Sequence, residues 1–190
     1  IEQANPTYPC LLDPEQEVGD LYNMLNVPNA VWIDEEGRIV RPTEPAGTGD
    51  EFRTMNDPGG IAPDDASRMR QRRRGYLDAI RDWVRNPESA SVWSPEEAAT
   101  IARARAHTHD DAAAFAHFRF GAWLSRQGRS EESALQLAEA RRLKPDSWAF
   151  RRQSWELEEV GKAGGPEFWA AVKALGDTPY YPVPEMPGHD

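Results

Sequence analysis

The sequence predicts a mixed α/β unit followed by an all-α unit, and three observations lead to this fold class. Residues 8–42 alternate short apolar runs with a helical pattern, as strands and helices do. From residue 94 onward, helix start signals follow one another without a strand pattern between them. Of the 190 residues, 39% are apolar and 28% are charged, so we expect one ordinary globular domain or two small ones.

The first elements are expected to be a strand and a helix. The apolar run Tyr-Pro-Cys-Leu-Leu-Asp at 8–13 predicts a buried strand. Asp13 can cap a helix over about 14–25, which carries one apolar face. Pro28 then ends the helical pattern, because the residue before a proline is biased towards an extended conformation.

A hairpin and a second helix are expected next. The strand-like runs 29–34 and 38–42 flank a Glu-Glu-Gly turn and predict a β-hairpin. The stretch 43–64 is rich in Gly, Pro, Asp and Thr, which predicts a long surface loop. A helix is expected over 65–86, where the first unit, residues 1–86, ends.

The second unit, residues 94–176, is expected to be entirely helical. Ser94 can cap its first helix while Glu97 reaches back to form a capping box. Four more helices are expected to start near residues 111, 130, 148 and 166. The proline-rich tail, residues 177–190, is expected to be extended and to lie against the helices.

The charge pattern narrows the function classes. A net charge of −10 argues against general binding to nucleic acids or anionic membranes, because both are polyanions. The arginine cluster at 68–74 is expected to be a solvated helix face, with a phosphate or acidic-partner site as the alternative. There is no apolar run long enough to span a bilayer and no charged leader before an apolar core, so we expect a cytoplasmic protein.

Neither a metal site nor a bound cofactor is expected. The run His-Thr-His-Asp-Asp at 107–111 holds ligand-type residues, but adjacent side chains point in different directions, so a polar link with Asp110 as a helix cap is expected. Cys10 is the single cysteine and cannot form an internal disulfide. We expect it to be a small buried residue of the first strand, with a redox thiol as the alternative.

Residues 8–42, "YPCLLDPEQEVGDLYNMLNVPNAVWIDEEGRIVRP", resemble the C-terminal half of a thioredoxin-like domain of the TlpA/ResA and redoxin kind. The resemblance implies that residues 1–86 are an incomplete thioredoxin-like unit without its N-terminal active-site half. Pro28 takes the place of the family's cis-proline, so Val27 and Pro28 would contact the backbone of a substrate. The resemblance assigns no catalytic residue to this chain.

Residues 120–146, "FGAWLSRQGRSEESALQLAEARRLKPD", resemble one tetratricopeptide repeat. The resemblance implies a tetratricopeptide-like helical module in which small residues let paired helices approach closely. His117 and Ser133 depart from the usual repeat pattern. The matching positions are Gly121, Leu124, Gly128, Leu137, Ala140 and Pro145.

Together the resemblances imply the substrate-facing portion of a thioredoxin-like thiol–disulfide oxidoreductase or peroxide-related protein. The catalytic motif would lie upstream of Ile1, and this chain alone would be inactive. A non-catalytic interaction module is the alternative. The expected partners are the missing N-terminal segment or a second copy of the chain, besides a protein or thiol substrate. We expect contact through Cys10–Leu12 and Ala30–Ile33, because unpaired sheet edges and exposed apolar surface favour association.

Overall fold

The computed structural model describes residues 5–55, 57 and 59–184, which contain seven α-helices and one two-stranded antiparallel sheet. The fold is therefore mixed α/β and mostly helical. Its elements, in chain order, are α1 (Glu17–Leu21), β1 (Asn29–Ile33), β2 (Ile39–Pro45), the 3-10 helix η2 (Asp50–Thr54), α2 (Pro63–Arg85), α3 (Pro95–Ala104), α4 (His109–Arg126), α5 (Ser130–Leu143), α6 (Trp148–Glu158), the 3-10 helix η3 (Lys162–Gly164) and α7 (Pro166–Ala174).

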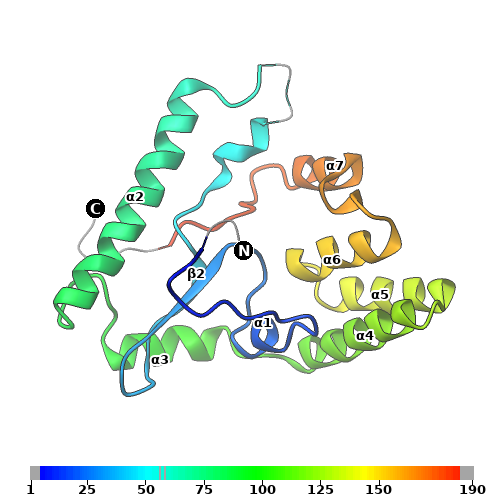
Figure 1. Cartoon of the computed structure of the whole chain (residues 1–190), viewed down its shortest axis with the longest axis horizontal. Helices are drawn as coiled ribbons and strands as arrows, with labels where there is room; N and C mark the ends of the chain where they lie inside the picture. Colours follow the sequence, from blue (N-terminus) through cyan, green and yellow to red (C-terminus); the bar gives the residue numbers. More distant parts are fainter. Residues whose placement is uncertain (1–4, 56, 58, 185–190) are drawn as a thin grey trace.

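The sheet lies near the centre of the molecule, with α2 on one side and the helices α4 to α7 on the other (Figure 1). After α7 the chain returns towards the sheet and passes between η2 and the hairpin (Figure 1). This return path brings the last described residues close to the start of β1.

The predicted hairpin is confirmed, and α2 covers one of its faces. Asp34 Oδ1 accepts hydrogen bonds from the backbone N–H groups of Glu36 (3.1 Å) and Arg38 (2.8 Å), which closes the turn. Trp32 is buried against Tyr76 of α2, and its indole N–H donates to the Tyr76 hydroxyl at 2.8 Å. The predicted helix over 65–86 thus exists, and it holds the sheet in place.

A buried ion pair within β2 joins the hairpin to the segments packed against it. The Arg41 side chain is fully buried and donates to both carboxylate oxygens of Glu44, at 2.8 and 2.6 Å. It also donates to the Ser91 carbonyl at 2.8 Å, while Glu44 accepts from the Tyr76 hydroxyl at 3.0 Å. One arginine therefore connects β2 to α2, through Glu44, and to the segment that follows α2.

The expected buried strand at 8–13 is wrong. No strand forms in the described part of that region, and the side chains of Leu11 and Leu12 are 89% and 84% exposed. Cys10 is also exposed, so it is not a small buried residue. The physical reason is that β1 and β2 pair with each other, and within the described residues no further strand pairs with the 8–13 run.

The helix expected over 14–25 is reduced to α1. Gln16 and Asn23 adopt positive φ angles of 57° and 49°, which interrupt the helical backbone at both ends. The N-cap of α1 is Gln16 rather than the expected Asp13. The Asp13 carboxylate still accepts from N–H groups of the first turn, those of Glu17 (2.8 Å) and Gly19 (3.0 Å).

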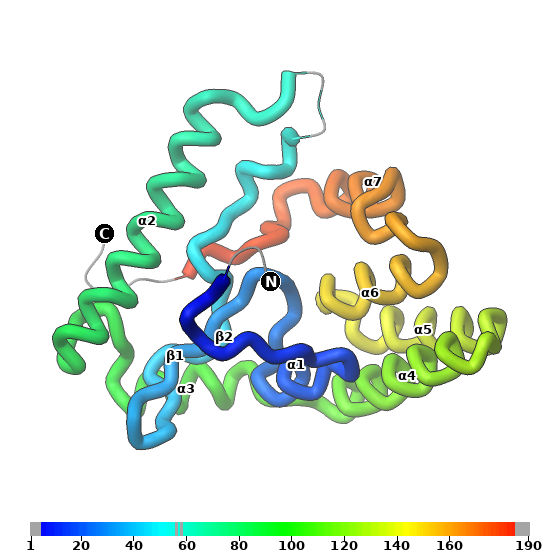
Figure 2. Tube along the Cα trace, viewed as in Figure 1, coloured from blue at the N-terminus to red at the C-terminus, as the bar shows by residue number. Residues whose placement is uncertain are grey.

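Helices α4 and α5 form a closely packed antiparallel pair (Figure 2). A Cβ placed on Gly121 would lie 2.8 Å from Leu137 side-chain atoms, so only glycine permits this approach. The two residues that depart from the repeat pattern join the helices: Ser133 donates to the Gly121 carbonyl at 2.8 Å, and His117 Nδ1 lies 2.7 Å from Gln136 Oε1.

One predicted helix N-cap is confirmed, that of α3, and another is wrong, that of α4. Ser94 and Glu97 form the predicted capping box of α3. The cap of α4 is Thr108 rather than Asp110, and its box partner is Asp111. Because α4 begins at His109, Asp110 lies inside the first turn, where the helix dipole favours a carboxylate.

Candidate functional site

Val27 and Pro28 lie in the link between α1 and β1, and the peptide bond between them is cis, as predicted. The Val27 side chain is 58% exposed. The Val27 N–H donates to the side-chain oxygen of Asn26 at 2.9 Å, and the Val27 carbonyl accepts from the Tyr181 hydroxyl at 2.6 Å. The backbone groups expected to contact a substrate are therefore bonded within the chain.

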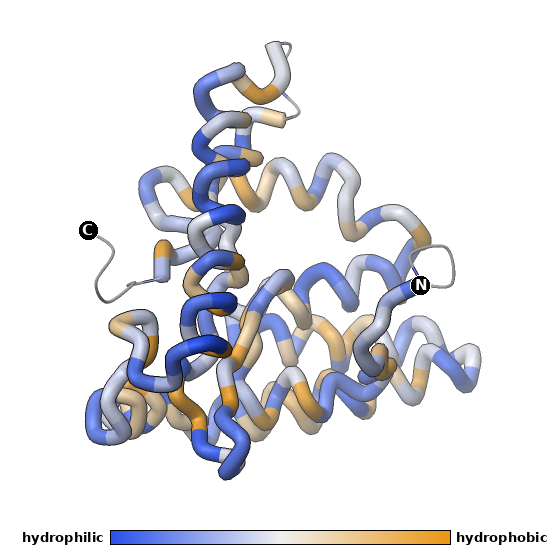
Figure 3. Tube along the Cα trace, turned by 60° about the vertical axis from the view of Figure 1, so that its left-hand side comes forward, coloured by the Kyte–Doolittle hydropathy of each residue, from blue (hydrophilic) through white to orange (hydrophobic). Residues whose placement is uncertain are grey.

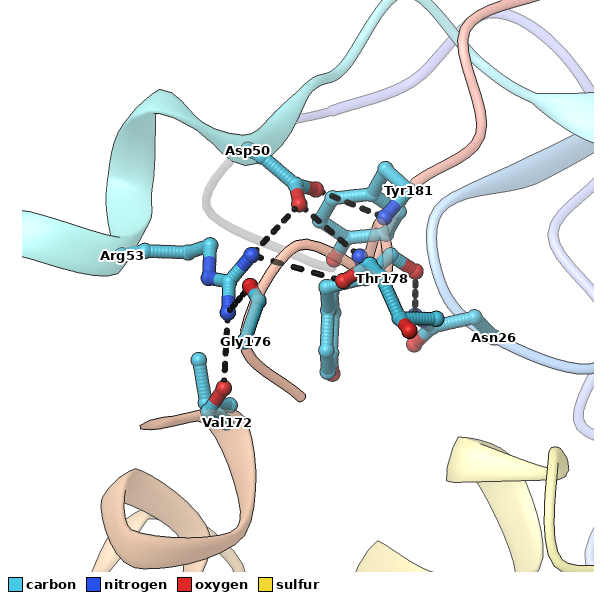
Figure 4. Close-up of polar contacts among 8 residues, drawn as sticks. Asn26, Asp50, Arg53, Val172, Gly176, Thr178 and Tyr181 are labelled. Atoms are coloured by element: carbon cyan, nitrogen blue, oxygen red, sulfur yellow. Dashed lines mark hydrogen bonds and ion pairs between the residues drawn. The ribbon is translucent and has the colours of Figure 1, made fainter. Parts of the chain in front are cut away.

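The segment that reaches Val27 is residues 175–184, which we call the strap. It has no helix or strand and crosses from the end of α7 towards the start of β1 (Figure 2). The Asp50 carboxylate accepts from two consecutive strap amides, those of Tyr180 (2.8 Å) and Tyr181 (2.7 Å). The Asn26 side-chain amide donates to the Tyr180 carbonyl at 3.3 Å, so the strap backbone is held from both sides (Figure 4).

Arg53 anchors the base of the strap (Figure 4). Its guanidinium donates to the carbonyls of Val172 (2.9 Å), Gly176 (3.0 Å) and Thr178 (3.4 Å), and it lies 3.3 Å from Asp50. A cation at this position satisfies carbonyls at the C-terminal end of α7, where the helix dipole favours positive charge. The strap is therefore held by η2, through Asp50 and Arg53.

The two strap tyrosines are buried among aromatic rings. The Tyr180 ring lies 4.4 Å from that of Trp148 and 5.0 Å from that of Phe52, measured between centroids. The Tyr181 ring lies 5.6 Å from Phe52. Burial raises the pKa of both tyrosine hydroxyls, so they stay protonated and can donate hydrogen bonds at neutral pH.

A cavity of about 560 Å³ lies beside the strap, between the α1–β1 link and the start of α6. Lys144 lines it, is 4% exposed, and places Nζ 2.8 Å from Asn23 Oδ1 and 3.4 Å from Asp111 Oδ1. Arg151 also lines it, with its guanidinium 4.7 Å from the Trp148 ring centroid. This volume is in the range that holds a small ligand or peptide side chains.

The strap contacts described above involve neither Cys10 nor the arginine cluster, whereas Asp111 of the 107–111 run lines the cavity. Cys10 lies in the exposed segment before α1, whereas Val27 and Pro28 lie after α1. In the arginine cluster on α2, Arg72 pairs with Glu51 at 2.7 Å and Arg68 pairs with Asp65. Most residues of α2 are hydrophilic (Figure 3), and Arg68, Arg70, Arg73 and Arg74 are exposed, in line with the expected solvated helix face.

Sequence reasoning missed the residues that hold the strap. Asn26, Asp50 and Arg53 had no motif to mark them, because their partners lie more than a hundred residues away. The tail gave one usable signal, a Tyr-Tyr pair flanked by prolines at 179 and 182. Two adjacent aromatic residues in an otherwise polar tail indicate a docking contact.

Comparisons with protein-family models, curated proteins and solved structures find no match to this chain. Within the described residues, none of the helices combines the length and apolar character needed to cross a membrane. In the same part of the chain, no cluster of three or more His, Cys, Asp or Glu side chains could hold a metal ion.

Proposed function

We propose that this chain is the substrate-facing portion of a thioredoxin-like redox protein and that it binds an extended polypeptide at the Asn26–Val27 link. One observation carries the proposal: a segment without helix or strand lies against this link, bonded to Asn26 and Val27 through its own backbone and a side chain. Recognition of a substrate backbone beside a strand of the thioredoxin-like unit is the role that the resemblance implies for Val27 and Pro28.

The reacting group of such a protein would come from another segment or polypeptide. Dithiol exchange requires an attacking thiolate and a resolving thiol, and Cys10 is the single cysteine of this chain. The proposal therefore predicts a Cys-x-x-Cys motif, or a variant based on cysteine or selenocysteine, upstream of Ile1 or on a partner. The proposed function needs no metal or bound cofactor, and the proposed location is the cytoplasm.

The residues encoded ahead of Ile1, or those of a polypeptide that copurifies, provide the first test. A redox motif there supports the proposal, and its absence from both overturns the redox role. In the complete protein, Val27→Asp places a charge on an exposed side chain beside the proposed binding link. It is expected to lower kcat/KM for insulin reduction by about tenfold, which corresponds to ~1.4 kcal/mol. Val160→Asp is the matched control, because Val160 is 90% exposed and lies in the α6–η3 link.

A second candidate function, a non-catalytic docking module, is favoured by exposed apolar side chains near the N-terminus. Leu11, Leu12 and Leu21 are 89%, 84% and 78% exposed. Of the surface expected at Ala30–Ile33, Ile33 is exposed, whereas Trp32 is buried against α2. The partner would be the N-terminal segment of the same protein or a second copy of the chain.

Light scattering tests the docking module. A dimer that becomes a monomer in a Leu11→Asp/Leu12→Asp variant supports association through this surface, since charges there would have to be desolvated on binding. A wild-type chain that is a stable monomer, with a cooperative melt and no partner, contradicts it.

A further inference from the structure

We propose that the strap is an intramolecular ligand, and that the groove under it binds segments that carry an aromatic residue followed by a tyrosine, with which the strap competes. By the groove we mean the surface that the strap covers, which consists of Asn26, Val27, Asp50, Phe52 and Trp148. The inference rests on the proposed polypeptide-binding role and is independent of the redox chemistry.

The groove binds the strap through hydrogen bonds to backbone groups. Asp50 uses one carboxylate oxygen for the Tyr180 amide and the other for the Tyr181 amide, at 2.8 and 2.7 Å. Asn26 donates to the carbonyl of Tyr180 at 3.3 Å. Because every non-proline residue carries these backbone groups, the same contacts are available to another segment that adopts the same bent backbone at these two residues. The carboxylate makes the two amide contacts charge-assisted and so among the stronger hydrogen bonds.

The groove also contacts the side chains at two neighbouring positions of the strap. Tyr180 is 3% exposed and packs edge-on or tilted against Phe52 (5.0 Å) and Trp148 (4.4 Å). Tyr181 fills the next position, and its hydroxyl donates to the Val27 carbonyl at 2.6 Å. Phenylalanine could fill the second position by shape, but it would leave the Val27 carbonyl without this donor. The groove thus selects an aromatic residue followed by a tyrosine.

The strap itself contains no helix or strand, so its release would break only its own hydrogen bonds and its packing against Trp148, Phe168 and Val172. Its ends are solvent-exposed around the buried tyrosines: Val183 is 63% exposed, and residues 176–179 are exposed as well. Because the strap is tethered, it acts at an effective concentration on the order of millimolar, so a free peptide competes poorly until the strap is weakened.

Fluorescence anisotropy with a labelled peptide tests the proposal on the full chain. The peptide is Thr-Pro-Tyr-Tyr-Pro-Val, the sequence of residues 178–183, and the control peptide carries Ala-Ala in place of Tyr-Tyr. The strap variant Tyr180→Ala/Tyr181→Ala is expected to bind the peptide at least about tenfold more tightly than wild type, because its own strap no longer competes. Adding Asp50→Asn to the strap variant is expected to reverse the gain, and the control peptide is expected not to bind.

A folded strap variant that binds the tyrosine peptide no better than wild type overturns the proposal. If that variant does not fold, amide hydrogen exchange of the wild-type chain tests the proposal instead. Tyrosine peptide at a concentration above the roughly millimolar effective concentration of the strap is expected to accelerate exchange of the Tyr180 and Tyr181 amides, and unchanged exchange there overturns the proposal. Peptide binding in a protein that lacks redox activity would keep this inference and remove the redox role.

Discussion

Replacing Glu44 with alanine is expected to destabilise the protein strongly, because it leaves the Arg41 guanidinium buried without its carboxylate. The Arg41 side chain is 0% exposed and that of Glu44 is 8% exposed, so water cannot replace the lost partner. Breaking a buried ion pair by removing one partner costs about 3–5 kcal/mol in the free energy of unfolding. For a chain of this size, where each kcal/mol shifts Tm by roughly 2–4 °C, the expected loss is roughly 6–20 °C.

The matched control lies in the same hairpin. Glu36 pairs with Arg38 at 2.9 Å, but the two side chains are 63% and 67% exposed. Glu36→Ala is therefore expected to cost about 0–1 kcal/mol. Thermal melts followed by circular dichroism, with urea titrations for the free energy, measure both variants. A Glu44→Ala loss no larger than that of Glu36→Ala would refute the argument.

A double variant separates the buried charge from simple loss of packing. Arg41→Met/Glu44→Met removes both charges and keeps apolar volume between Trp32 and Trp93, whose ring centroids lie 5.2 and 5.6 Å from the Arg41 guanidinium carbon. It is expected to be more stable than Glu44→Ala, since no uncompensated charge stays buried. A double variant that is less stable would show that packing, not charge, sets the cost.

Three further predictions follow from the structure. Gly121→Val is expected to cost about 1–3 kcal/mol through the clash with Leu137; a melt no lower than that of the exposed-site control Ala116→Val contradicts it. Burial raises the pKa of Asp20 above its ordinary 3.8, opposed in part by nearby cations. The folded state therefore binds this proton more tightly, and stability is lost as pH rises from 3.8 through the raised pKa. Asp20→Asn is thus expected to raise Tm at pH 7 and to leave it unchanged below pH 3.8, and an equal Tm at pH 7 is the contrary result. The pure chain is expected to show no dithiol reductase activity with insulin, and turnover that disappears in Cys10→Ser would make Cys10 catalytic.

Local signals in the sequence predicted the elements that depend on local interactions. The hairpin at 29–42, the long helix α2 and the capping box at Ser94 follow from turn residues, apolar periodicity and side chains three residues apart. The strand expected at Cys10 failed because an apolar run forms a buried strand only if another strand and a covering layer receive it.

The candidate site was predicted in part. Val27 and Pro28 were chosen through the family resemblance. The cis peptide bond between them is confirmed, whereas their contact with a substrate stays a prediction. Their partner was not predictable, because no periodicity or spacing relates Asp50 to Tyr180. That contact depends on how η2 and the strap are brought together by the packing of the whole chain.

The strap also has a consequence for synthesis on the ribosome. The hydrogen bonds that close the groove join residues 130, 131 and 154 positions apart. At translation rates of about 5–20 residues per second, the interval between the emergence of Asp50 and that of Tyr180 is on the order of ten seconds. Throughout that interval the nascent chain presents Asn26, Val27 and Phe52 without their cover. Chaperones or a partner chain can reach this surface during synthesis more easily than after release.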